Sequence, residues 1–290
     1  MLVRHGVYDS DPPVLINAAP AHHADALGLL VYSTGRSSFN NSVAIVSGPT
    51  EAIVVDAGYT RADALRIAAA VLDSGRRLSV IFVSNADPDY YFGAATLKSI
   101  FPEARVLATP AVRERIAATI DAKFEYWAPK IGANAPASLI VPEALQRDAL
   151  NVDGHVLEVR GTDGILAHRP YVWIPSLRAI VGNVGIFGGL HVWTADTKTK
   201  DERAAWIAQL DEMEALDPRI VVPGHMARGT ELDRRAIQHT RAWLQDFEAV
   251  LTRADSSRAI VEAMKARYPR AGFELALELG AAVAVDGLQW

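Results

Sequence analysis

Cysteine is missing from all 290 residues of the chain. The protein therefore forms no disulfide, uses no thiolate nucleophile and builds no cysteine-ligated zinc site. No apolar run reaches the roughly 18 residues that cross a bilayer, and the first residues lack the apolar core of a signal peptide. These absences indicate a cytoplasmic protein that does not enter a membrane.

The chain also lacks any long block of lysine or arginine. Its 29 basic side chains are outnumbered by 34 acidic ones, which gives a net charge of −5. This balance argues against a nucleic-acid-binding surface as the main function. Half of the residues are hydrophobic and 22% are charged, as is ordinary for a globular protein. We therefore expect no nucleic-acid or membrane partner, while a homodimer stays open.

Short apolar runs predict strands, and helical spacing of apolar residues predicts helices. The expected strands are residues 28–32, 42–47, 52–56, 78–83, 106–108, 156–159, 171–174, 179–181 and 220–222. The expected helices are residues 62–74, 94–100, 110–122, 204–216, 231–254 and 258–266, and the Ala-, Pro- and Gly-rich segment 126–142 is expected to be irregular. Strands come first, β/α alternation follows, and the arrangement repeats. This order predicts an α/β fold, the αββα sandwich.

The domain organisation follows from the same reading. One domain is expected to span residues 1–290, because the length suits a single large α/β unit. Residues 1–25 are polar and contain proline, so we expect them to wrap over the domain. Residues from about 231 to 290 are expected to form a C-terminal helical and β extension.

Polar residues cluster where the predicted strand 78–83 gives way to a helix. Asn85, Asp87, Asp89 and Tyr90 follow the strand within residues 84–93. Open α/β sheets place their sites at the carboxyl ends of strands. Asp87 before Pro88 also has a structural interpretation, because aspartate is a good helix N-cap and proline is favoured at the first helical position.

The stretch 84–93 resembles the metal-binding signature of the metallo-β-lactamase superfamily, His-x-His-x-Asp-His. Asn85 and Asp87 stand where the first two histidines would be, Asp89 keeps the aspartate, and Tyr90 replaces the last histidine. Residues 41–45, 52–58 and 221–225 resemble further elements of that family, in the right order. The resemblance covers most of residues 28–250 and implies the αββα fold.

The resemblance also places the remaining metal ligands. In the family, the third histidine precedes a proline that opens a strand. If Pro175 is that proline, Asp163 occupies the position of the histidine. The bridging aspartate of the family follows a glycine at the end of the next strand, and here Asn183 follows Gly182. Of the usual zinc ligands of the family, only Asp89 and His225 keep the same residue type. Zinc prefers imidazole and thiolate ligands, whereas the oxygen ligands here suit Mg²⁺, Mn²⁺ or Ca²⁺. We expect no tight dizinc site, and either one divalent metal at Asp87, Asp89 and His225 or no metal at all.

Without a cation, converging aspartates repel one another. At least one of Asp87, Asp89 and Asp163 should then keep its proton or find a lysine or arginine. A carboxylic acid held in this way is poised for proton transfer.

By the resemblance, the chain hydrolyses a small-molecule ester, lactone, thioester or amide. Asp87, Asp89 and His225 would orient or deprotonate the water, and Tyr90 would donate a proton or position the substrate. Asn85 and Asn183 would donate hydrogen bonds to the developing oxyanion. The other residues expected at the substrate are Asp163, His191, Trp193 and Tyr91.

Two other functions stay open from the sequence. The first is a non-catalytic small-molecule-binding protein whose metal site decayed. The second is a metal-independent lyase or isomerase that uses aspartate and tyrosine as acid and base. Loss of the zinc histidines favours these alternatives, whereas the intact polarity of residues 85–90 favours an enzyme.

Overall fold

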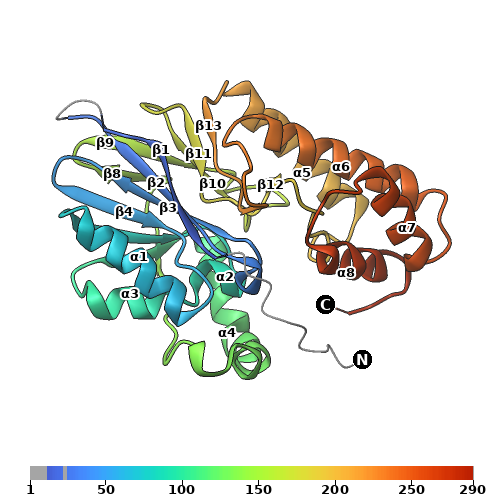
Figure 1. The fold of residues 1–290 in the computed structure, drawn as a ribbon, viewed down its shortest axis with the longest axis horizontal. Coiled ribbons are helices and arrows are strands. Elements are labelled where there is room, and N and C mark those ends of the chain that lie inside the picture. The colour runs from blue at the N-terminus through green and yellow to red at the C-terminus, as the bar shows by residue number, and fades with distance from the viewer. Residues whose placement is uncertain (1–11, 22–24, 290) are drawn as a thin grey trace.

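The computed structural model describes residues 12–21 and 25–289. Two β-sheets lie face to face, and helices cover the outer face of each (Figure 1). This arrangement confirms the αββα sandwich that the sequence predicts. Within the described residues, no helix combines the length and the apolar character needed to cross a membrane.

The first sheet has seven strands in chain order, antiparallel from β1 to β4 and parallel from β4 to β7. Its strands are β1 (Val14–Ala19), β2 (Gly28–Ser33), β3 (Ser42–Ser47), β4 (Glu51–Val55), β5 (Arg77–Val83), β6 (Arg105–Ala108) and β7 (Glu143–Ala144). The helices that belong to this half are α1 (Arg61–Asp73), α2 (Pro88–Tyr91), α3 (Ala94–Ile100) and α4 (Pro110–Ile131).

The second sheet has the strand order β13-β11-β10-β9-β8, and β12 and β14 form a separate parallel pair. The strands are β8 (Ala149–Val152), β9 (His155–Arg160), β10 (Tyr171–Ile174), β11 (Ala179–Val181), β12 (Phe187–Gly188), β13 (Ile220–Val221) and β14 (His225–Met226). The helices are α5 (Lys200–Ala215), α6 (Arg235–Leu251), α7 (Ser257–Arg267) and α8 (Glu274–Val285).

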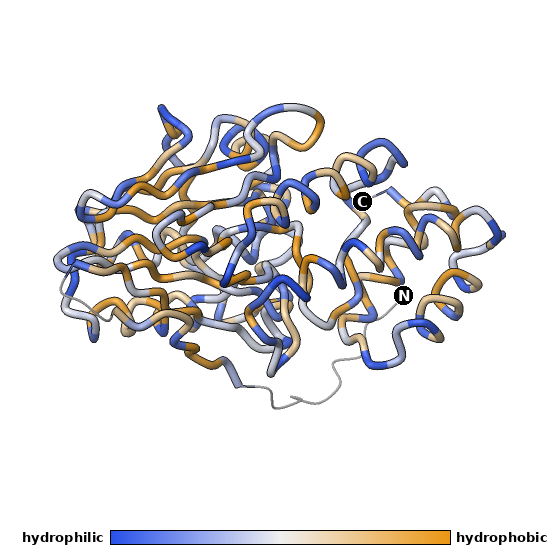
Figure 2. Tube along the Cα trace, turned by 90° about the horizontal axis from the view of Figure 1, so that it is seen from above, coloured by the Kyte–Doolittle hydropathy of each residue, from blue (hydrophilic) through white to orange (hydrophobic). Residues whose placement is uncertain are grey.

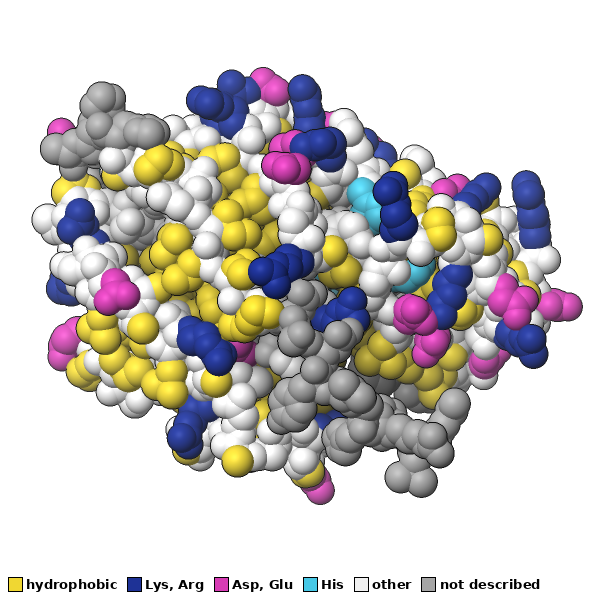
Figure 3. Space-filling view, viewed as in Figure 1, with side chains coloured by type: hydrophobic (Ala, Val, Ile, Leu, Met, Phe, Trp, Pro, Cys, Tyr) yellow, Lys and Arg dark blue, Asp and Glu magenta, His cyan; other side chains and the backbone are white. Residues whose placement is uncertain are grey.

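Alternation along the strands divides the interior into three apolar layers. In β10, Val172 and Ile174 pack between the two sheets, whereas Tyr171 and Trp173 pack against the C-terminal helices. The hydrophobic segments in Figure 2 follow the strands, and hydrophilic segments mark the turns. On the face shown in Figure 3, hydrophobic side chains gather over the sheet-bearing half, and basic side chains are interspersed with acidic ones.

Several elements differ from the sequence-based expectation, among them β1, α8 and the end of α4, while β7, β8, β12, β14 and α2 are not among the expected elements. Part of the expected N-terminal wrap is strand β1, which pairs with β2; residues 1–11 and 22–24 of that wrap lie outside the described residues. The described part of the C-terminal extension folds into α6, α7 and α8, and the extra helix α8 follows an isolated bridge between Leu190 and Gly272.

Helix α4 continues through Pro129, so the expectation of an irregular segment from residue 126 is wrong for its first turns. Phe124, Trp127 and Ile131 recur on one side of the helix and pack against the first apolar layer. This packing outweighs the one hydrogen bond that Pro129 removes near the end of the helix. The helix ends at Gly132, which adopts a positive φ of 66°.

Candidate active site

The ends of four strands bring the polar residues of the candidate site together. Asp56 follows β4, Asn85 follows β5 and Asn183 follows β11, while the turn after β13 leads to His225 in β14. The backbone of this turn is tied across the molecule, since the Ser42 N–H donates to Gly224 O (2.9 Å) and the Met226 N–H donates to Asn40 O (2.9 Å). His225 is thereby anchored to the first sheet.

Asp89, His225 and Tyr90 lie in contact with one another. His225 Nε2 lies 3.7 Å from Asp89 Oδ2 and 3.2 Å from the hydroxyl of Tyr90. The Tyr90 hydroxyl also lies 3.3 Å from Asn183 O. Asp89 Oδ2 is buried and has no hydrogen-bond partner among the described residues. Burial, and then the nearby charge of Asp87, hold the pKa of Asp89 well above its ordinary value.

The ring of His225 is fixed by its contacts. Its Nδ1 lies 2.9 Å from Phe39 O, which can only accept, so Nδ1 carries the proton and the neutral ring has its lone pair on Nε2. Phe187 stacks on the ring at 5.0 Å, and Phe273 lies at 5.7 Å. Burial lowers the pKa of His225 to about 4. The imidazole is therefore a neutral hydrogen-bond acceptor directed at Tyr90 and Asp89.

Asp87 is paired with a lysine that sequence reasoning missed. Lys123 Nζ, on α4, lies 3.0 Å from Asp87 Oδ1 and donates to Ala86 O at 2.7 Å. Burial opposes the ionised form, but the attraction and hydrogen bond of Lys123 outweigh it, so the pKa of Asp87 is below its ordinary value. Asp87 is also the N-cap residue of α2, although its side chain makes no capping hydrogen bond.

Both asparagines predicted to bind an oxyanion are engaged by the backbone. Asn85 Oδ1 accepts from the Asp87 N–H at 2.8 Å. Asn183 Nδ2 donates to Val222 O, and its Oδ1 accepts from the Ile186 N–H, each at 2.9 Å. In this geometry Asn183 holds the loop after β11 in place, and its expected role at the oxyanion stays a prediction.

Asp56 ties the end of β4 to the end of β5 through hydrogen bonds with Ser84. It is 1% exposed and accepts from the N–H of Ser84 (2.8 Å) and from its hydroxyl (2.9 Å). Burial raises the pKa of Asp56 to about 7, although the two hydrogen bonds from Ser84 oppose the shift. The residue adopts a φ of 70°, a left-handed conformation that aspartate tolerates better than most residues.

Several other predicted residues lie apart from this contact set. Asp163 is exposed on a loop and belongs to no metal-holding group within the described part of the chain. His191 is buried and accepts from Trp243 Nε1–H at 3.1 Å, which places it in the helical core. Tyr91 is fully buried against Phe92. Both His191 and Tyr91 pack in the interior, and their expected contact with substrate stays a prediction.

Trp193 belongs to a half-buried aromatic group next to His225. It stacks on Phe273 at 6.0 Å. Phe273 in turn lies 6.1 Å from Phe39, which contacts Tyr59 at 5.1 Å and Trp127 at 5.5 Å. Trp193, Phe273, Phe39 and Trp127 each keep part of their surface exposed. The aromatic group therefore offers an apolar wall beside the polar site.

The family resemblance implies a dizinc centre, and the donors here do not fit one. Asp87 is committed to Lys123, and Asn85 Oδ1 is committed to a backbone N–H. Tyr90 stands where an imidazole would be needed, and its pKa lies above its ordinary value because of burial. Across the part of the chain that the structure describes, no three His, Cys, Asp or Glu side chains are arranged to hold a metal ion.

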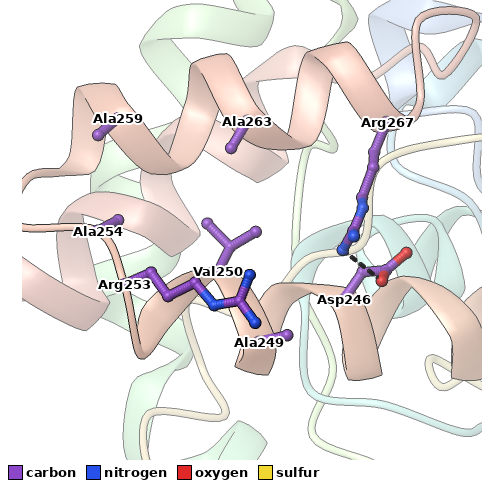
Figure 4. A pocket seen from close by; sticks show the side chains of 8 residues that line it. All are labelled: Asp246, Ala249, Val250, Arg253, Ala254, Ala259, Ala263 and Arg267. Atoms are coloured by element: carbon purple, nitrogen blue, oxygen red, sulfur yellow. Dashed lines mark hydrogen bonds and ion pairs between the residues drawn. The ribbon is translucent and has the colours of Figure 1, made fainter.

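A separate surface groove of about 460 Å³ lies between α6 and α7 (Figure 4). Alanines on both helices line it, and Arg267 at one end pairs with Asp246. None of the residues that line this groove belongs to the contact set around Asp89. The groove and the candidate site are therefore different features of the molecule.

The fold is shared with known proteins. The model of the metallo-beta-lactamase superfamily matches residues 36–225. No curated protein matches the chain. A metallo-beta-lactamase family protein from Thermus thermophilus is 16% identical, with a TM-score of 0.58 over 93% of this chain and 90% of that one.

Two further solved structures are similar in the same way. A metallo-beta-lactamase from Pontibacter korlensis is 14% identical, with a TM-score of 0.56 over 81% of this chain and 99% of that one. A metallo-beta-lactamase from Hirschia baltica is 12% identical, with a TM-score of 0.54 over 80% of this chain and 98% of that one. At these identities the likeness shows the fold alone.

Proposed function

Because the chain belongs to the metallo-beta-lactamase superfamily, we propose that it hydrolyses an ester, lactone, thioester or amide bond of a small molecule with its own side chains. The observation that carries this proposal is the unpartnered, buried Asp89 Oδ2, 3.7 Å from His225 Nε2. A buried carboxyl oxygen without a hydrogen bond costs free energy. A water held between these two acceptors would donate to both.

The contacts of Asp89 and His225, together with the directions of their pKa shifts, support one of them as the base. Burial lowers the pKa of His225 to about 4, whereas burial and the charge of Asp87 raise the pKa of Asp89. A general base works best when its pKa approaches the working pH. Asp89 takes the proton of the attacking water in this proposal, because its buried Oδ2 has no other hydrogen-bond partner among the described residues, and His225 orients that water through its Nε2 lone pair.

Tyr90 stabilises the arrangement from the other side. Its hydroxyl donates to Asn183 O at 3.3 Å, so the lone pair of His225 Nε2 stays available to the water, and burial raises the pKa of Tyr90 above its ordinary value. Asn41 lies beside His225 through a backbone bridge, and both polar atoms of its buried side chain lack partners among the described residues. Its amide is the better candidate to bind a developing oxyanion than Asn183.

A panel of lactones, thioesters and aryl esters tests the proposal. Turnover by the wild type that is lost in Asp89→Asn supports the hydrolase. A wild type that is inert across the panel, yet stabilised against thermal unfolding by one compound, supports a binding protein instead. The burial of the site favours this second function, a binding protein, since the side chains of Asp89 and His225 are each only 7% exposed.

A further inference from the structure

An aromatic side chain from the C-terminal helices lies against the ring of His225. Phe273 is the N-cap residue of α8, and its ring centre lies 5.7 Å from that of His225. It also lies 6.0 Å from the ring centre of Trp193 and 6.1 Å from that of Phe39. Phe39 packs against the first apolar layer, and its carbonyl accepts from the His225 ring. Phe273 therefore joins the C-terminal helices to the first half of the molecule at the candidate site.

The backbone of Phe273 is held in a left-handed conformation. Its φ is 64° and its ψ is 48°, values that a bulky residue rarely adopts. Phe39, on the other side of the contact, has a φ of 59°. Strain of this kind persists only where surrounding contacts impose it, and it clusters at active sites and ligand clamps. Two strained aromatic residues that meet beside His225 thus indicate a functional use of their contact.

Phe273 can leave its place without disturbing the polar contacts of the site. Phe39 O accepts from His225 Nδ1, so moving the backbone of Phe39 would release the imidazole. The ring of Phe273 makes no hydrogen bond, and turning it about its side-chain torsions breaks only apolar contacts. The backbone beside it stays tied meanwhile, since the His191 N–H donates to Gly272 O at 2.9 Å.

The segment that carries Phe273 lies beyond the match to the family model, which ends at residue 225. The contacts among Asp89, Tyr90 and His225 lie within that match. The side chains of Asp89 and His225 are each only 7% exposed, so a ligand reaches them only when a covering side chain moves. Phe273 is a half-buried ring that contacts His225 and is free to turn.

We propose that Phe273 is the specificity-determining residue of the candidate site: its ring covers the approach to His225 and Asp89, turns aside to admit a ligand, and limits the size of the acyl group that enters. Turning the ring uncovers the apolar faces of Trp193 and Phe39. The entering group then packs on them, which favours an apolar acyl group over a charged one. This inference rests on the proposed hydrolase function for the acyl group, but not for the access to His225.

Modification of His225 by diethyl pyrocarbonate, followed by peptide mass spectrometry on the full chain, measures access without any substrate. The reagent acylates a neutral imidazole nitrogen, and Nε2 of His225 carries the lone pair. We expect Phe273→Ala to raise the rate at His225 at least fivefold. Leu275→Ala removes a 41% exposed apolar side chain from the same helix and should leave the rate unchanged.

Phe273→Gly covers the case in which the alanine variant does not fold, because glycine adopts a φ of 64° without strain. It removes the same ring and should raise the rate at His225 in the same way. His191, buried in the helical core, reports any general loosening of the C-terminal helices. An unchanged rate at His225 in a folded variant, or a rise shared equally by His191, would overturn the role of Phe273.

Turnover of the acetyl and phenylacetyl esters of one phenol tests the size limit. Phe273→Ala should raise kcat/KM for the phenylacetyl ester at least tenfold relative to the acetyl ester, and Leu275→Ala should keep the ratio of the wild type. An unchanged ratio in Phe273→Ala would contradict the size limit. A wild type that hydrolyses neither ester counts against the hydrolase alone, because the measurement of access does not need turnover.

Discussion

Asp89 Oδ2 faces His225 Nε2 across 3.7 Å, and neither atom belongs to a metal-holding group among the described residues. Two acceptors face each other there because Nδ1 of His225 holds its proton against Phe39 O. This relationship explains why the site favours a donor, such as a water molecule, at that place.

Asp89→Asn should reduce turnover by roughly two to four orders of magnitude, the usual contribution of a general base. The amide is nearly isosteric, but it cannot accept the proton of the water. Burial and the charge of Asp87 disfavour the ionised carboxyl, so the melting temperature should stay the same or rise. Steady-state rates and thermal melts of the same preparation check both parts.

Asp87→Asn provides the comparison for that variant. It removes the negative charge that faces Lys123 at 3.0 Å, although Lys123 keeps its hydrogen bond to Ala86 O, so we expect a lower melting temperature together with reduced activity. Full activity in Asp89→Asn would contradict the base assignment, whatever the result for Asp87→Asn.

Asp56→Asn should flatten the pH dependence of folding stability. The pKa of Asp56 is about 7 in the folded state against 3.8 ordinarily, so between these values the folded state binds more protons. Stability therefore falls as pH rises from about 4 to 7, by at most about 4 kcal/mol from this group. Asparagine can keep both contacts with Ser84 and never ionises. Urea unfolding of both proteins from pH 4 to 8 gives the difference, and parallel curves would contradict the prediction.

His191 gives the folding stability a pH dependence of the opposite sign, and His191→Asn should remove it. Burial lowers the pKa of His191 to about 4, so the unfolded state binds the extra proton below pH 6.5. Stability is then lost as pH falls from 6.5 toward 4, by at most about 3 kcal/mol. Asparagine retains an acceptor for Trp243 without titrating. Denaturant midpoints measured from pH 4 to 7 should converge for the two proteins toward acid, and a constant difference would rule out the linkage.

Gly224→Ala should destabilise the fold by about 2 kcal/mol or more, because overpacking against backbone cannot relax easily. A Cβ there would lie 2.0 Å from Asn183 O and 2.6 Å from the Tyr90 hydroxyl. Gly272→Ala is the matched control, since its Cβ would meet only the flexible end of Leu190 at 3.3 Å. Similar unfolding free energies for the two variants would show that the close approach is not rigid.

The sandwich itself could be predicted because its strands are short apolar runs whose order is fixed by the chain. The continuation of α4 past residue 126 could not, since Pro129 and the surrounding alanines are typical of loops. Only tertiary packing of Phe124 and Trp127 keeps that segment helical. Strand β1 was missed for a related reason, because its extended conformation depends on pairing with β2.

For the site, the sequence indicated Asp89, Tyr90 and His225, which the structure brings into contact. Lys123 carries no local signal, because a lone cation on a helix is ordinary. The expectation that a converging aspartate would find a cation is nevertheless met by Lys123 at Asp87.

Hydrolysis by chelator-treated protein, with zinc content measured by mass spectrometry on the same sample, tests the central claim most directly. The account predicts well under one zinc per chain before treatment, and turnover of a panel ester that survives chelation and is lost in Asp89→Asn. Two tightly bound zinc ions per chain, or activity that disappears with the metal and returns on its addition, would contradict it.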